Sequence, residues 1–208
     1  MEAVEQFAIE PLSEKDRPDL VAPLAEWILE AGEPYYSMLF GGRESALAAV
    51  RRWMARSSSE IALSRVRIAS VGGSVAGGFI GLNGSELARA RKADLIALTS
   101  ADPGRAKGLL ERLAALKGLF VEIEPDEYYL SKIFIALRFR GQNLSRPLLR
   151  AYLVEGQRAG HRRFALEVRA DNAPAIRAYS RAGFSISART SSVDGTANYL
   201  SMKYEVSP

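Results

Sequence analysis

The residues best suited to chemistry lie in one stretch, from Leu166 to Phe184. Asn172 and Pro174 predict the start of a helix, because asparagine caps helix N-termini and proline fits only the first turn. Tyr179 follows Asn172 by seven positions, about two helical turns, so both side chains can face one ligand from the same helix side. Taken singly, Asn172 is also read as a plain helix cap and Tyr179 as a core aromatic residue.

A second candidate is the turn Arg140-Gly141-Gln142-Asn143-Leu144-Ser145, which joins a β-rich segment to a predicted helix. A strand that enters a helix through such a turn gathers successive backbone N–H groups, and the positive end of the helix dipole, at one spot. Such a spot binds phosphate. An Arg-Gly turn before a helix is also common in α/β proteins that bind no phosphate.

Both segments need a sheet and helices to position them. Hydrophobic periodicity and breaker residues predict strands over 7–12, 66–70, 75–80, 128–135, 164–168, 184–189 and 199–204. They predict helices over 20–31, 35–40, 44–56, 87–98, 103–119, about 143–159, and after Asn172, with Ser13 and Asp16 as cap residues for the first. We interpret residues 1–208 as a single domain with a helical insertion at approximately 85–122, packed over the sheet.

Composition excludes several function classes. The absence of cysteine excludes disulfides, a thiolate nucleophile and thiolate metal sites, and a single histidine, His161, excludes a histidine-rich metal cluster. We expect no metal, and we interpret His161 as a solvated loop residue. A net charge of +4 without a run of five like charges makes nucleic acid an unlikely main partner. Without a secretory signal or a run of about 20 apolar residues, the protein is expected to be soluble and cytoplasmic, with no membrane partner.

The order of these motifs is similar to that of the GNAT family of N-acetyltransferases. Strand, Arg-Gly turn and helix are followed by strand, Asn-x-Pro-Ala helix with a tyrosine, and Gly183-Phe184, over about Tyr128 to Phe184. The resemblance implies an α/β GNAT fold, with a mixed, mostly antiparallel central sheet of about seven strands flanked by helices. The helical insertion would precede the cofactor-binding strand. It also implies acetyl-coenzyme A as cosubstrate and an amine as acceptor.

Site residues can be carried over from the family motif position by position. The strand backbone at Phe134 and Ile135 would meet pantetheine, Asn172 would contact the cofactor, and Tyr179 would be the general acid for the leaving thiolate. The phosphate loop would consist of Arg140, Gly141, Gln142, Asn143, Leu144 and Ser145. This chain departs from the family at Asn143 and Ser145, where glycine is usual, and at Leu137, where proline is common.

Several questions stay open at the level of sequence. Glu122, Glu124, Asp126, Glu127 and Glu167 are candidates for the base that deprotonates the amine, although each is more simply interpreted as a solvated acidic residue, and the sequence does not rank them. Without cysteine, direct transfer is simpler than a thiol-bound acyl-enzyme. The alternatives are a catalytically impaired module that binds coenzyme A through a degenerate phosphate loop, and a basic nucleic-acid adaptor.

The sequence says little about acceptor specificity or oligomeric state. Trp27, Tyr35, Tyr36 and Trp53 belong either to the core or to a pocket. A homodimer would form if the closing strand, 199–204, lay at an exposed sheet edge, where a second copy could pair with it.

Overall fold

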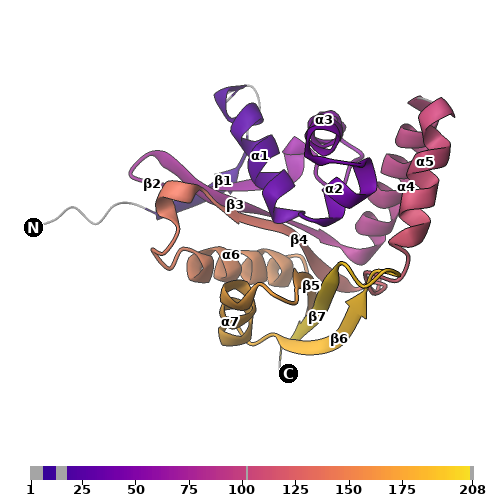
Figure 1. Ribbon diagram of the computed structural model, residues 1–208. Coiled ribbons are helices and arrows are strands. Elements are labelled where there is room, and N and C mark those ends of the chain that lie inside the picture. Colours follow the sequence, from indigo (N-terminus) through magenta and orange to yellow (C-terminus); the bar gives the residue numbers. More distant parts are fainter. Residues whose placement is uncertain (1–6, 13–17, 102, 207–208) are drawn as a thin grey trace, which may run out of the picture.

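A seven-stranded mixed sheet organises the chain, in the order β1-β2-β3-β4-β5-β7-β6. The computed structural model describes residues 7–12, 18–101 and 103–206 (Figure 1). All neighbouring strands pair antiparallel except β4 and β5, which are parallel. The strands are β1 Phe7–Pro11, β2 Val66–Val71, β3 Ser74–Asn83, β4 Glu127–Ile135, β5 Arg163–Arg169, β6 Ser185–Ser191 and β7 Asn198–Glu205. The predicted fold class is confirmed.

Helices cover both faces of this sheet (Figure 1). Helices α1 Val21–Ala31, α2 Tyr35–Phe40 and α3 Arg43–Met54 lie on one face, and α6 Ser145–Arg158 and α7 Ala173–Arg181 lie on the other. Helices α4 Gly84–Ala101 and α5 Pro103–Ala115 stand side by side next to α2 and α3. The short 3-10 helices are η1 Pro18–Leu20, η2 Leu63–Arg65 and η3 Leu137–Phe139.

Each face has its own hydrophobic core. The first is centred on the buried side of α1, where Leu24, Ile28 and Leu29 are fully buried. The second packs α6 and α7 against the sheet around Tyr152 and Phe164, whose rings lie edge to face with centroids 5.7 Å apart. Burial of these apolar stripes is the main force that fixes the helices on the sheet.

Several predicted boundaries differ from the structure by a few residues, and two of the helix boundaries have a cause in the backbone. Helix α6 begins at Ser145 rather than near Asn143, because Asn143 has a left-handed backbone with φ of 58°. Helix α5 ends at Ala115 rather than Leu119, just before Gly118, which has φ of 83°. The predicted cap residues Ser13 and Asp16 lie outside the described residues.

The closing strand is not at an edge of the sheet, so it is not available for pairing between two copies of the chain. Strand β7, which contains Tyr199 to Tyr204, is paired with β5 on one side and β6 on the other. Its backbone groups are therefore already used within the sheet, and it cannot pair with a second copy. The outer strands of the sheet are β1 and β6.

Strands β4 and β5 diverge along their length, and this positions the site. Their parallel pairing ends at Leu130 and Leu166, although β4 continues to Ile135 and β5 to Arg169. On its other side, β4 stays paired with β3 as far as Ile135, with a register shift at Ser131. The second half of β4 thus has backbone groups that face away from β3 without a strand partner.

Within the described ranges, no helix has the length and apolar composition to cross a bilayer. In the same ranges, no group of three or more acidic or histidine side chains is arranged to hold a metal ion.

Candidate active site

A cavity of about 720 Å³ opens where β4 and β5 diverge. Strand β4 lines it from Leu130 to Ile135, and β5 lines it from Glu167 to Arg169. The start of α6 and one side of α7 complete the lining. Of the predicted site residues, the structure brings seven together around this cavity: Phe134, Ile135, Arg140, Gly141, Ser145, Asn172 and Tyr179.

The predicted phosphate loop has the backbone of an anion site. Gly141 and Asn143 both have left-handed backbones, with φ of 80° and 58°, which asparagine tolerates better than most residues. Among the described groups, none accepts a hydrogen bond from the backbone N–H of Gly141, Asn143 or Ser145. These N–H groups lie at the start of helix α6, where the helix dipole favours negative charge. Gln142, Asn143 and Leu144 belong to the loop but do not line the cavity.

The Arg140 side chain is held across the cavity rather than left free. Its Nε donates to the Ile135 carbonyl oxygen at 3.1 Å, and its Nη2 lies 2.7 Å from Glu30 Oε2 on α1. Both members of this ion pair are about half exposed. Such a pair contributes little to stability but ties the loop to α1. Sequence reasoning missed Glu30, which reads as an ordinary charged position on a helix.

Asn172 and Tyr179 lie on the cavity side of α7, as their spacing predicts. Asn172 also caps the helix, because its Oδ1 accepts from the Ala175 N–H at 3.2 Å. Tyr179 is 7% exposed, and burial raises the pKa of its phenol, which therefore stays protonated at neutral pH. Among the described residues, none hydrogen-bonds the Tyr179 hydroxyl.

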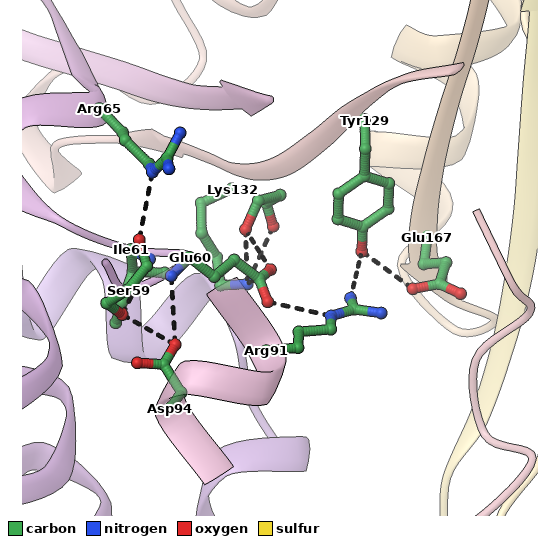
Figure 2. A network of polar contacts seen from close by, with 10 residues as sticks. Ser59, Glu60, Ile61, Arg65, Arg91, Asp94, Tyr129, Lys132 and Glu167 are labelled. Atoms are coloured by element: carbon green, nitrogen blue, oxygen red, sulfur yellow. Dashed lines mark hydrogen bonds and ion pairs between the residues drawn. The ribbon is translucent and has the colours of Figure 1, made fainter. Parts of the chain in front are cut away.

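A second cavity of about 390 Å³ lies between the sheet and helices α2, α4 and α5. It shares Ala31, Ser131, Lys132, Glu167 and Tyr199 with the first cavity, so the two spaces meet at these residues. Figure 2 shows the polar groups that reach toward this junction from four segments: the loop after α3, helix α4, strand β4 and strand β5.

Glu60 is the anionic centre of this network. Its Oε2 lies 3.0 Å from Arg91 Nε, and its Oε1 accepts from the Ser131 hydroxyl at 2.5 Å and lies 3.9 Å from Lys132 Nζ. Although burial raises its pKa, attraction to Arg91 and Lys132 outweighs burial and lowers the pKa to about 2. Glu60 is thus a carboxylate that holds two cations and is a very weak base.

Glu167 has the opposite character. Burial raises its pKa to about 7, against the attraction of Arg91 and two hydrogen bonds. Its Oε2 accepts from the Tyr129 hydroxyl at 2.9 Å (Figure 2). Its Oε1 accepts from the Val121 N–H at 3.0 Å. A carboxyl group with a pKa near neutrality, placed where two cavities meet, is suited to accept a proton.

The other four candidate bases are elsewhere. Glu122, Glu124 and Asp126 are exposed on the loop before β4 and line neither cavity. Glu127 is fully buried, with its Oε1 2.6 Å from Lys203 Nζ and 3.3 Å from Arg163 Nη2. Of the five candidate bases, the structure places Glu167 at the cavities and the other four away from them. Glu60, Arg91 and Lys132 also line the second cavity, and sequence reasoning missed them.

Residues 86–184 match the model of the acetyltransferase (GNAT) family. No curated protein matches the chain.

Solved structures share the fold of the chain. One, an acetyltransferase, has 21% sequence identity and a TM-score of 0.64, with 96% of this chain and 100% of that chain covered. An N-acetyltransferase from Staphylococcus aureus Mu50 has 17% identity and a TM-score of 0.66, with 94% and 99% covered. The yncA protein of Salmonella typhimurium, solved with its cofactor acetyl-CoA, has 13% identity and a TM-score of 0.55, with 97% and 94% covered.

Proposed function

We propose that the chain is an acyltransferase of the acetyltransferase (GNAT) family, whose model residues 86–184 match, and that it transfers an acetyl group directly from acetyl-coenzyme A to an amine. The observation that carries this proposal is one cavity that holds the free amides of Gly141 and Ser145, the unpaired half of β4 and the Tyr179 phenol. The acceptor is a small molecule or a peptide.

The cosubstrate fits the groups on the cavity wall. Its pyrophosphate would be bound by the N–H groups that open α6, because successive free amides at a helix start attract phosphate oxygens. Its pantetheine arm would lie along β4 at Phe134 and Ile135, where a polar chain can pair with strand groups that β5 leaves unpaired. Asn172 lines the same cavity and retains its amide NH₂ as a donor.

The chemistry follows from the protonation states. An ammonium group cannot attack a thioester, so the acceptor must first lose a proton, and Glu167 is the base that we assign. The amine nitrogen then forms a bond to the acetyl carbon while the bond from that carbon to sulfur breaks. Tyr179 donates its proton to the departing sulfur, and the nitrogen loses its second proton as the neutral amide forms, which replaces the proton that the phenolate has given up. Backbone N–H groups in the second half of β4 are the donors available to the carbonyl oxygen as negative charge develops.

The alternative, a module that binds coenzyme A without catalysis, rested on Asn143 and Ser145 in the loop. Asn143 takes up the left-handed backbone that glycine usually supplies, and Ser145 is small enough to begin α6, so neither residue distorts the loop. The nucleic-acid adaptor has no such observation in its favour.

Two measurements test the proposal. Calorimetry with acetyl-coenzyme A should give saturable binding, and release of free thiol should depend on added amine. Binding without thiol release for any amine would favour the non-catalytic module. An absence of binding by folded protein would refute both.

A further inference from the structure

Two buried polar atoms in the lining of the second cavity have no hydrogen-bond partner. They are Nε1 of Trp53 on α3 and Oδ1 of Asp94 on α4. Trp53 is 8% exposed and Asp94 is 6% exposed, and no other side-chain nitrogen or oxygen of the described residues is buried without a partner. Because an unpaired buried donor or acceptor costs free energy, nearly all such atoms in folded proteins are paired. Two of them around one cavity point to a ligand that pairs with them.

The indole of Trp53 is held in place by neighbouring rings. It lies edge to face with the rings of Tyr36 and Phe40, at centroid distances of 6.0 Å and 5.2 Å. Pairs of this kind favour one relative orientation of the rings, so the Nε1–H keeps its direction. The cavity wall therefore carries a fixed hydrogen-bond donor on the α3 side.

The carboxylate of Asp94 is held through one of its two oxygens. Oδ2 accepts from the Ser59 hydroxyl at 2.9 Å and from the Glu60 N–H at 3.1 Å, and Figure 2 shows both contacts on that single oxygen. These two bonds fix the side chain and leave Oδ1 free to accept. The cavity wall therefore carries a fixed hydrogen-bond acceptor on the α4 side.

The two atoms restrict the chemical group that can satisfy both of them. The Trp53 N–H only donates and the Asp94 carboxylate oxygen only accepts, so the group must itself accept one hydrogen bond and donate another. A hydroxyl group and a primary carboxamide do both. An ammonium group has no acceptor, a carboxylate has no donor, and an alkyl group has neither.

We propose that Trp53 Nε1 and Asp94 Oδ1 form a specificity subsite for a neutral group of the acceptor that both accepts and donates a hydrogen bond, namely a hydroxyl or a carboxamide. The inference rests on the proposed function, in which the reactive nitrogen lies beside Glu167 where the two cavities meet. The apolar remainder of the acceptor would contact the leucine side chains of α4 and α5 that line the same cavity.

Calorimetry on the unaltered protein, with and without saturating coenzyme A, tests the subsite. The probes are linear amines from propyl to hexyl whose far end is a hydroxyl or a carboxamide. They are compared with amines of the same length that end in a methyl group or in a second amine. At the best length, one polar probe should bind about tenfold more tightly than both comparison amines, as two net hydrogen bonds would provide.

The better of the two polar probes identifies the group. Equal binding of the polar and methyl probes is the result expected if a water molecule pairs with both atoms, and it would overturn the inference. Tighter binding of the diamine than of either polar probe would overturn it as well.

Two conservative variants each change one atom of the subsite. Trp53→Phe removes the donor and keeps an aromatic ring, whereas Asp94→Asn keeps an oxygen for Ser59 and Glu60 and replaces Oδ1 by an NH₂ group that cannot accept. In each variant the preference for the polar probe over the methyl probe should fall from about tenfold to about threefold or less, with the affinity for the methyl probe kept. Glu44→Gln, at an exposed position of α3 outside the lining, is the control and should keep the full preference.

A preference that stays at its full size in a folded variant would remove that residue from the subsite. An equal loss of affinity for both probes would show that the residue only supports the cavity wall, and it would overturn the assignment too. The variants test the two atoms independently, and the comparison on the unaltered protein decides if neither folds.

The outcomes also separate this inference from the proposed function. Preferred binding of a polar probe without thiol release from any amine would keep the subsite and contradict acetyl transfer. Thiol release with the same kcat/KM for the polar, methyl and diamine probes would support acetyl transfer and overturn the subsite.

Discussion

At the scale of single residues, the account depends on two groups with opposite tasks. Tyr179 must keep its proton until sulfur leaves, and Glu167 must be able to take one. Burial favours both states, because it disfavours the charged form of each side chain. The phenol stays protonated, and the carboxyl group titrates near neutrality.

Replacing Tyr179 by phenylalanine should separate chemistry from binding. The ring stays in place and only the hydroxyl is lost, so kcat should fall by about 10²- to 10⁴-fold while coenzyme A affinity changes little. Steady-state thiol release and calorimetry measure the two quantities. Wild-type kcat in Tyr179→Phe would remove the acid role from this residue.

Glu167 should set the acid limb of the pH profile. Since burial raises its pKa to about 7, the fraction of deprotonated carboxylate, and with it kcat/KM, should rise with pH through about 7 and then level off. Glu167→Gln should be slower by about 10²-fold or more and should lack that limb. Glu122→Gln, at an exposed candidate that lines neither cavity, should keep the wild-type rate and profile. A limb that persists in Glu167→Gln would assign the base elsewhere.

At the scale of elements, the loop before α6 depends on one left-handed position. Asn143 has φ of 58°, so Asn143→Gly should preserve loop shape, whereas Asn143→Ala should destabilise it by roughly 1–2 kcal/mol. We expect coenzyme A affinity to be kept in the glycine variant and reduced in the alanine variant. Calorimetry measures both affinities, and the glycine variant is the control for the alanine variant because both remove the asparagine side chain. Equal affinities would show that the loop does not bind the cosubstrate through this backbone.

Helix α6 is positioned on the sheet by a close approach at Gly156. A Cβ atom there would lie 2.5 Å from a Phe164 ring carbon and 2.6 Å from a Tyr128 ring carbon, both in buried side chains. Gly156→Ala should therefore lower the free energy of unfolding by about 1–3 kcal/mol, despite better helix propensity, and should weaken coenzyme A binding. Gly108→Ala in α5, where the nearest atom is 3.6 Å away, should be neutral or slightly stabilising in urea titrations. A neutral Gly156→Ala would mean that α6 has room to shift.

Local signals account for what the sequence predicted. The segments from β4 to α6 and from β5 to α7 were predicted because glycine, proline, asparagine and apolar periodicity act over a few residues. The network around Glu60 has no such signal: Ser131 lies 71 positions away and Arg91 lies 31 positions away. Arg91 reads as a solvated helix position, and only tertiary packing reveals that it is partly buried and paired with Glu60. The position of β7 inside the sheet could not be predicted for the same reason, since strand order does not depend on neighbouring residues.

At the scale of the whole molecule, the divergence of β4 from β5 and the packing of α4 and α5 beside α2 produce two cavities that meet. One is lined by free backbone donors, and the other by apolar side chains together with the charged network around Glu60. The cosubstrate and the acceptor would thus approach from different sides of the sheet and meet at Lys132 and Glu167. This arrangement favours a complex in which both substrates are bound before transfer.

The central claim is that acetyl-coenzyme A binds between the diverging strands. A crystal structure of the protein with coenzyme A tests it most directly. We predict pyrophosphate oxygens within hydrogen-bonding distance of the N–H groups from Gly141 to Ser145, pantetheine along Phe134 and Ile135, and the sulfur beside the Tyr179 hydroxyl. Coenzyme A bound at another surface, with the cavity between β4 and β5 filled by the protein's own side chains, would contradict the account.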